Sequence, residues 1–156
     1  GASIWTPKQG EKGMTRKECN ERMQTLVGEE AHEKLLANGR EMEPKKGTEA
    51  EPDFWPVVKL FLLIGEATWL LTEIDPEDER VAFGCADLGL GFPEMGSVWL
   101  PELLEITVGV PICKPDGTKI DEALFTVEKD PLFTAKAPLS WYAREARAAG
   151  SLAAVS

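Results

Sequence analysis

The chain has 156 residues and a mass of 17.1 kDa, which predicts one domain large enough to bury a core without metals or disulfides. Its 43% hydrophobic and 28% charged residues are typical of a globular protein. A net charge of -10 disfavours direct binding to nucleic acid, because neutralising phosphates requires Lys and Arg. No apolar run approaches the roughly 20 residues that cross a bilayer. Gly1-Ala2-Ser3 resembles a cloning remnant rather than a secretory signal, so we expect a cytoplasmic protein without membrane contact.

The cysteine and histidine content offers little for metal or redox chemistry. The chain has three cysteines, which are far apart in the sequence: Cys19, Cys85 and Cys113. His32 is its only histidine. This pattern predicts free thiols in a reducing compartment, and we expect neither a metal nor a cofactor. Because His32 has acidic neighbours in the sequence, we expect it to be partly exposed.

The negative charge is concentrated in one part of the chain. Residues 51–128 contain sixteen acidic and four basic residues, whereas residues 1–50 are neutral overall. Two interpretations remain open: a solvated surface that keeps the protein soluble, or a surface that attracts a basic protein partner. Such a partner would be a protein that normally binds nucleic acid, because carboxylates on this surface can take the positions of phosphates in its basic groove.

The N-terminal part is predicted to be a flexible arm followed by helices. Residues 1–14 mix Gly, Lys, Gln and Pro, and are expected to form the arm. Thr15 with Glu18 has the pattern of a capping box, so a helix should begin there. Apolar residues then recur at helical spacing, with a pause expected at Gly28.

This helical part, 15–39, is expected to end at Asn38-Gly39, a strong helix stop signal. Residues 40–53 contain two prolines, a glycine and mixed charges, which predict a linker or loop. The remainder, 54–156, is expected to form a sheet and a closing helix. Together, residues 15–156 are predicted to be a single α+β domain.

After residue 53 the hydrophobic pattern becomes that of strands. The strand candidates are 55–63, 67–74, 81–86, 97–100 and 132–134, with 120–127 ambiguous between strand and helix. Short connections, including the turn at Asp75-Pro76, favour consecutive antiparallel pairing. The fold class is therefore α+β, with an antiparallel sheet of about four to five strands.

The closing helix should begin near Pro138, be capped by Ser140 and end at Gly150. Its apolar face consists of Leu139, Tyr142, Ala143 and Ala146. We expect the N-terminal and C-terminal helices to cover the same face of the sheet.

Several strings of the sequence, taken in order, are similar to those of a known family. They are 35–40 (LLANGR), 56–61 (PVVKLF), 67–73 (ATWLLTE), 83–96 (FGCADLGLGFPEMG) and 138–150 (PLSWYAREARAAG). These resemble domain-of-unknown-function family 2958, small bacterial proteins often carried by plasmids and other mobile elements. The resemblance implies a bacterial, mobile-element context, and it provides no activity and no catalytic residues to transfer. Relative to the family, residues 113–128 look like an insertion.

Most enzyme classes find no support in the sequence. The glycine loop around Gly89 and Gly91 lacks the Lys-Ser/Thr of a phosphate-binding loop. A single histidine leaves cysteine and serine nucleophiles without an evident base. One enzymatic alternative remains, a small metal-dependent enzyme that acts on a phosphate-containing substrate. Its magnesium ligands would be drawn from Glu73, Asp75, Asp87 and Glu94.

The leading hypothesis is a non-enzymatic acidic interaction or inhibitor protein of a bacterial mobile element, which binds a basic protein partner. Trp141 lies off the main face of the closing helix, either as an interface anchor or packed within the fold. The candidate partner-binding residues are Glu73, Asp75, Glu77, Asp78, Asp87, Glu94 and Trp141.

Overall fold

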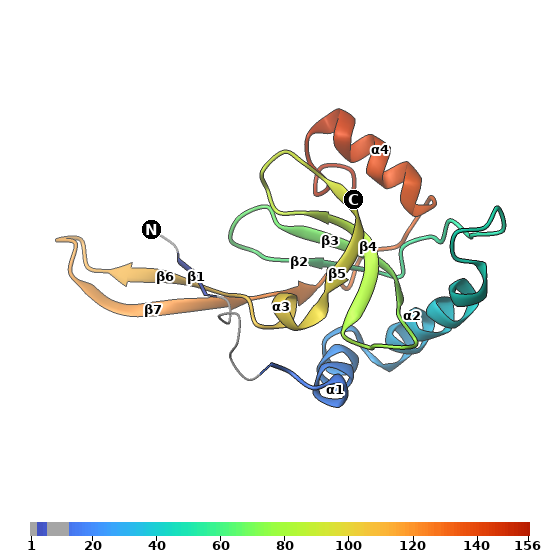
Figure 1. Ribbon diagram of the computed structural model, residues 1–156. Coiled ribbons are helices and arrows are strands. Elements are labelled where there is room, and N and C mark those ends of the chain that lie inside the picture. The colour runs from blue at the N-terminus through green and yellow to red at the C-terminus, as the bar shows by residue number, and fades with distance from the viewer. Residues whose placement is uncertain (1–2, 6–12) are drawn as a thin grey trace.

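The computed structural model describes residues 3–5 and 13–156 and confirms the α+β class (Figure 1). The helical elements are α1 (Arg16–Val27), α2 (Glu29–Met42), the short 3₁₀ turn η1 (Glu43–Lys45), α3 (Leu100–Leu104) and α4 (Leu139–Ala149). The strands are β1 (Ser3–Trp5), β2 (Val58–Phe61), β3 (Thr68–Ile74), β4 (Val81–Asp87), β5 (Glu94–Trp99), β6 (Thr107–Cys113), β7 (Lys119–Thr126) and β8 (Glu128–Lys129). None of the helices in the described ranges is long and apolar enough to cross a membrane.

The main sheet has five antiparallel strands in the order β5-β4-β3-β2-β8. Consecutive pairing of β2, β3, β4 and β5 confirms the predicted meander. The strand predicted at 132–134 is wrong, because the chain turns there: the Asp130 carboxylate accepts a hydrogen bond from the Leu132 amide at 2.9 Å. The fifth strand is instead the two-residue β8.

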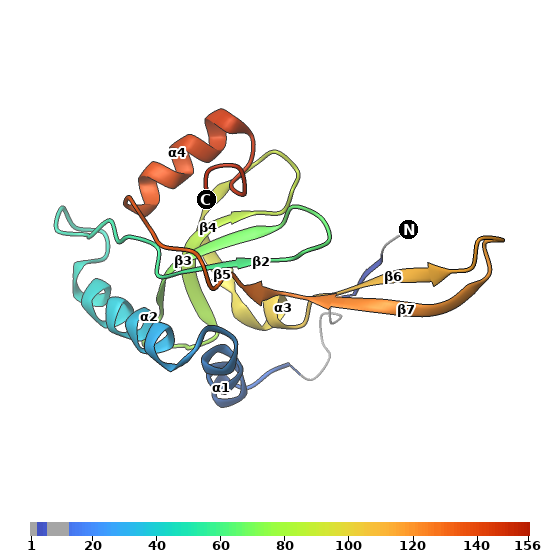
Figure 2. The ribbon, with the colours of Figure 1, turned by 180° about the vertical axis from the view of Figure 1, so that it is seen from behind.

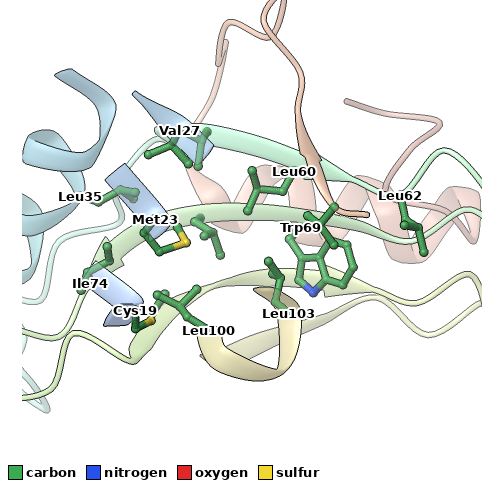
Figure 3. Close-up of a cluster of buried hydrophobic side chains, with 14 of the residues drawn as sticks. Cys19, Met23, Val27, Leu35, Leu60, Leu62, Trp69, Ile74, Leu100 and Leu103 are labelled. Atoms are coloured by element: carbon green, nitrogen blue, oxygen red, sulfur yellow. The ribbon is translucent and has the colours of Figure 1, made fainter. Parts of the chain in front are cut away.

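Helices cover both faces of this sheet, which corrects the prediction that they share one face. Figures 1 and 2 show α4 on one side and α1 and α2 on the other. On the α1 side, Met23 of α1, Trp69 of the sheet and Leu103 of α3 belong to one buried cluster (Figure 3). On the α4 side, Tyr142 packs with Leu70. Because Trp69 and Leu70 are consecutive, the strand supplies both cores by simple alternation.

The N-terminal helices begin as predicted but end later. The Thr15 side chain accepts a hydrogen bond from the Glu18 amide at 3.1 Å, which confirms the cap, and Gly28 separates α1 from α2 with φ 91°. The stop at Asn38-Gly39 is wrong, since α2 continues to Met42. The two residues serve packing instead: Asn38 donates to the Thr72 carbonyl at 2.9 Å, and Gly39 lies against the backbone of β3.

The environment of His32 also differs from the expectation of partial exposure. Its side chain is buried, and its Nε2 lies 2.8 Å from Oδ1 of Asn20. Burial lowers the pKa of His32, so the neutral ring is favoured at physiological pH. The residue therefore joins α1 to α2.

The closing helix confirms its apolar face and its end at Gly150, which has the left-handed φ of 76°. Its start differs from the prediction, because Pro138 occupies the cap position and Ser140 lies inside the first turn. Asp53 performs the capping from the loop before β2. Its carboxylate accepts hydrogen bonds from the amide and the hydroxyl of Ser140.

A hairpin of β6 and β7 extends away from the main sheet (Figure 1). It resolves the ambiguity of residues 120–127 in favour of a strand and includes most of the stretch expected to be an insertion. Backbone pairing with Ser3–Trp5 makes it a three-stranded sheet. The rest of the predicted arm, apart from Gly13 and Met14, lies outside the described residues.

Candidate functional site

A pocket of about 250 Å³ opens between the β3–β4 end of the sheet and the segment that follows α2. Glu73, Phe83 and Ser97 are aligned across three strands, since Glu73 pairs with Phe83 and Phe83 with Ser97. Residues that pair directly share a face of the sheet, so these side chains form one wall. The lining is completed by Gly39, Met42, Lys46, Gly47, Glu51, Asp75, Pro76, Val81 and Ala82.

Glu73 is the chemically distinctive member, because it is an acidic residue that is only 5% exposed. Its one side-chain hydrogen-bond partner among the described residues is the hydroxyl of Thr72, 3.2 Å away. Burial raises the pKa of Glu73 above its ordinary value; the Thr72 hydrogen bond and the charge of Lys46 oppose this rise, and the charges of Glu51 and Asp75 add to it. The Thr72 hydroxyl lies equally close to the Phe83 carbonyl, at 3.2 Å, and has a single proton to share between these two acceptors. In the neutral form, Glu73 can therefore donate to Thr72 while Thr72 donates to Phe83.

The pocket carries an excess of negative charge. Glu51, Glu73 and Asp75 contribute three carboxyl groups, and Lys46 is the single basic residue in the lining. The ammonium of Lys46 lies 3.1 Å from the Glu43 carboxylate, so a neighbour outside the lining engages it. Within the described residues, no Lys or Arg forms a salt bridge with Glu73. Lys46 nevertheless lies near enough for its charge to favour the ionised form of Glu73.

Two of the predicted site residues, Glu73 and Asp75, meet in this pocket, and the other carboxylates do not. Asp87 pairs with Thr68 at the opposite end of β3, roughly 15–20 Å away at about 3.3 Å per residue. Glu94 lies on β5 and lines a second groove. Across residues 3–5 and 13–156, no group of three or more His, Cys, Asp or Glu side chains is placed to hold a metal ion. The four carboxylates proposed as magnesium ligands are therefore not brought together.

Asp87 has a structural environment. Its side chain is buried and accepts hydrogen bonds from the Gly89 amide at 2.9 Å and the Leu152 amide at 2.8 Å. It therefore fixes both the glycine loop and the segment after α4.

The turn carboxylates are exposed or already paired. Asp78 holds the guanidinium of Arg80 through both oxygens, at 3.0 and 3.1 Å, and these hydrogen bonds lower the pKa of Asp78. Glu77 is exposed at the tip of the turn. Trp141 is half-buried, and its ring meets Tyr142 edge-on with centroids 5.0 Å apart. It packs in the α4 cluster, on the side of the sheet away from α1.

Sequence reasoning missed Lys46, Glu51 and Ser97 as pocket residues. The first two lie in a segment that reads as a polar linker, and Ser97 is a small polar residue in a strand. No local signal distinguishes them from ordinary surface residues, because only the path of the chain after α2 places them opposite Glu73.

The geometry defines an α+β protein with an acidic pocket at one end of an antiparallel sheet. The chain belongs to the family described as "Protein of unknown function (DUF2958)", whose model matches residues 26–153. No curated protein and no solved structure matches the chain significantly.

Proposed function

We propose that this protein is a non-enzymatic acidic interaction or inhibitor protein, whose Glu73 pocket receives a Lys or Arg side chain of a basic protein partner. The observation that carries the proposal is Glu73, an acidic residue that is 5% exposed, lines a pocket and forms no salt bridge among the described residues. Burying an unpaired charge is costly, whereas a guanidinium supplies both the opposite charge and the hydrogen bonds.

The size of the pocket supports a single side chain as the ligand. Pockets for drug-sized molecules have volumes of roughly 300–1,000 Å³. This one, at about 250 Å³, is smaller and open to solvent. One extended cationic side chain matches it better than a nucleotide or a sugar does. The charge of residues 51–128 would also steer a basic protein toward this region at low ionic strength.

The proposal is tested with N-acetyl-arginine amide as the probe and the neutral isostere N-acetyl-citrulline amide as its control. We expect millimolar binding of the arginine compound, with NMR shift changes concentrated at the amides of Gly47, Val81 and Ser97. Glu73→Gln should weaken binding at least tenfold, whereas Glu77→Gln, in the neighbouring turn, should not. Equal binding of citrulline, or unchanged binding to the Glu73→Gln protein, would refute the proposal.

Binding should also depend on pH in a defined direction. The free protein has a raised Glu73 pKa, and a bound cation stabilises the ionised carboxylate. Binding therefore releases a proton from Glu73, and affinity should rise as the pH increases through the pKa of the free protein. The Glu73→Gln protein should show a flatter pH profile in the same titration. An affinity that falls as the pH rises would contradict this assignment.

A further inference from the structure

Strand β5 is an open edge of the main sheet. It pairs with β4 on one side, and no strand in the described part of the chain pairs with it on the other. An edge strand directs backbone N–H and C=O groups outward at alternate residues, where a further strand can bind them. Edges are commonly blocked by lysine, proline or a covering element. Within β5, Glu94–Trp99, the one charged residue is Glu94 at its start.

An apolar groove of about 570 Å³ runs beside this edge. Trp69 of β3 and Leu103 of α3 contribute to its lining. Three large side chains of the glycine loop also line it and are mostly in solvent: Leu88 at 60%, Leu90 at 73% and Phe92 at 76% exposure. A concentration of exposed apolar side chains along a groove is typical of a binding surface.

The groove and the acidic pocket lie against opposite faces of the sheet. The groove includes Trp69 and Leu103, which belong to the core on the α1 side. The pocket wall includes Glu73 and Phe83, and Phe83 packs in the α4 cluster. Ser97, in the middle of β5, lines both. A strand added to β5 would therefore direct alternate side chains toward the groove and toward the acidic side.

Charge determines which occupant fits this edge. The charged residues in the groove lining are Glu94 and Glu102, both acidic. A second copy of the chain would bring another net charge of -10 against this surface, which opposes self-association. A basic segment gains from the same charges.

We infer that β5 is a strand-addition site for an extended segment of the basic partner, in which apolar residues alternate with Lys or Arg. The apolar residues occupy the groove beside Phe92, and the basic residues face the acidic pocket, whose carboxyl groups belong to Glu51, Glu73 and Asp75. Backbone hydrogen bonds to β5 provide affinity, and the alternation provides specificity. The basic half of this pattern rests on the proposed function, whereas the apolar half rests on the groove.

The test uses eight-residue synthetic peptides. One alternates valine with lysine, a second has the same composition with four valines followed by four lysines, and a third alternates valine with serine. We expect the alternating Val-Lys peptide to bind at least tenfold more tightly than the block peptide. It should also slow hydrogen exchange of the outward amides of β5. Phe92→Ser should weaken its binding at least tenfold, whereas Leu132→Ser, at an apolar residue 89% exposed outside the groove, should not.

The outcomes separate this inference from the proposed function. Equal binding of the alternating and block peptides, without protection of β5, would overturn strand addition and leave the acidic pocket intact. Protection of β5 by both the Val-Lys and the Val-Ser peptides, with no binding of N-acetyl-arginine amide, would support strand addition and refute the proposed function. A dimer in sedimentation analysis that Phe92→Ser dissociates would overturn the inference, because a second copy would then occupy the edge.

Discussion

Replacing Gly39 by alanine tests the packing of α2 on the sheet. In an exposed helix interior, Gly→Ala stabilises by about 1 kcal/mol. Here an added Cβ would lie 1.8 Å from the Ile74 carbonyl oxygen, although real contacts essentially never fall below 3.0 Å. The helix must therefore move from the strand by at least about 1 Å. A gap of 0.5–1 Å already forfeits roughly a quarter to a half of each dispersion contact.

Overpacking of this kind costs roughly 1–3 kcal/mol, and a backbone obstacle places Gly39→Ala near the upper end, at about 3 kcal/mol of lost unfolding free energy. For a chain of this size the melting temperature should fall by about 6–12 °C. Urea unfolding and calorimetry measure both quantities. Gly96→Ala is the control, because no atom lies within 4 Å of the position that its added methyl group would occupy. A Gly39→Ala protein as stable as the parent would refute the close contact between α2 and β3.

Three further predictions follow, two on carboxylates that accept backbone hydrogen bonds and one on the reactivity of the thiols. Asp87→Ala leaves two amides without their acceptor and should cost about 3 kcal/mol in urea unfolding, at roughly 1–3 kcal/mol per unsatisfied group. Asp53→Ala removes the cap of α4 and should lower the free energy of unfolding by about 1 kcal/mol in the same assay. Backbone amides of the neighbouring elements should keep their protection from hydrogen exchange. Cys113, which is exposed, should react promptly with a thiol reagent in the native protein. Cys19 and Cys85 should react only after unfolding, because burial raises both pKa values to about 11.

Local signals in the sequence predicted local structure well. The cap at Thr15, the break at Gly28 and the left-handed residue at Gly150 each depend on atoms within one helical turn. The turn after β3 belongs to the same class, since the Asp75 side chain accepts from the Glu77 amide at 2.8 Å. Such features can be predicted from the sequence because the interacting groups are close together in the chain.

Features that depend on distant segments were not predictable in the same way. Asn38-Gly39 has the composition of a helix stop, but tertiary contacts with β3 use both residues inside the helix. The side of the sheet covered by α4 was also missed, because an amphipathic helix specifies an apolar face and not which sheet face receives it. Glu73 and Asp75 were identified as candidates from the sequence. Lys46 and Glu51 were not, because only the three-dimensional path of the loop after α2 places them in the pocket.

An irregularity in β3 decides where the buried carboxylate lies. Leu71 faces the core on the α1 side, and strict alternation would place residue 73 there as well. A bulge between Leu71 and Glu73 shifts the register, so that Glu73 pairs with Phe83, on the α4 side, and Ile74 returns to the α1 core. Without the bulge, the carboxyl would replace an apolar side chain in the main core. The bulge therefore keeps the core apolar and creates the acidic pocket in a single step, which is why alternation alone could not locate the site.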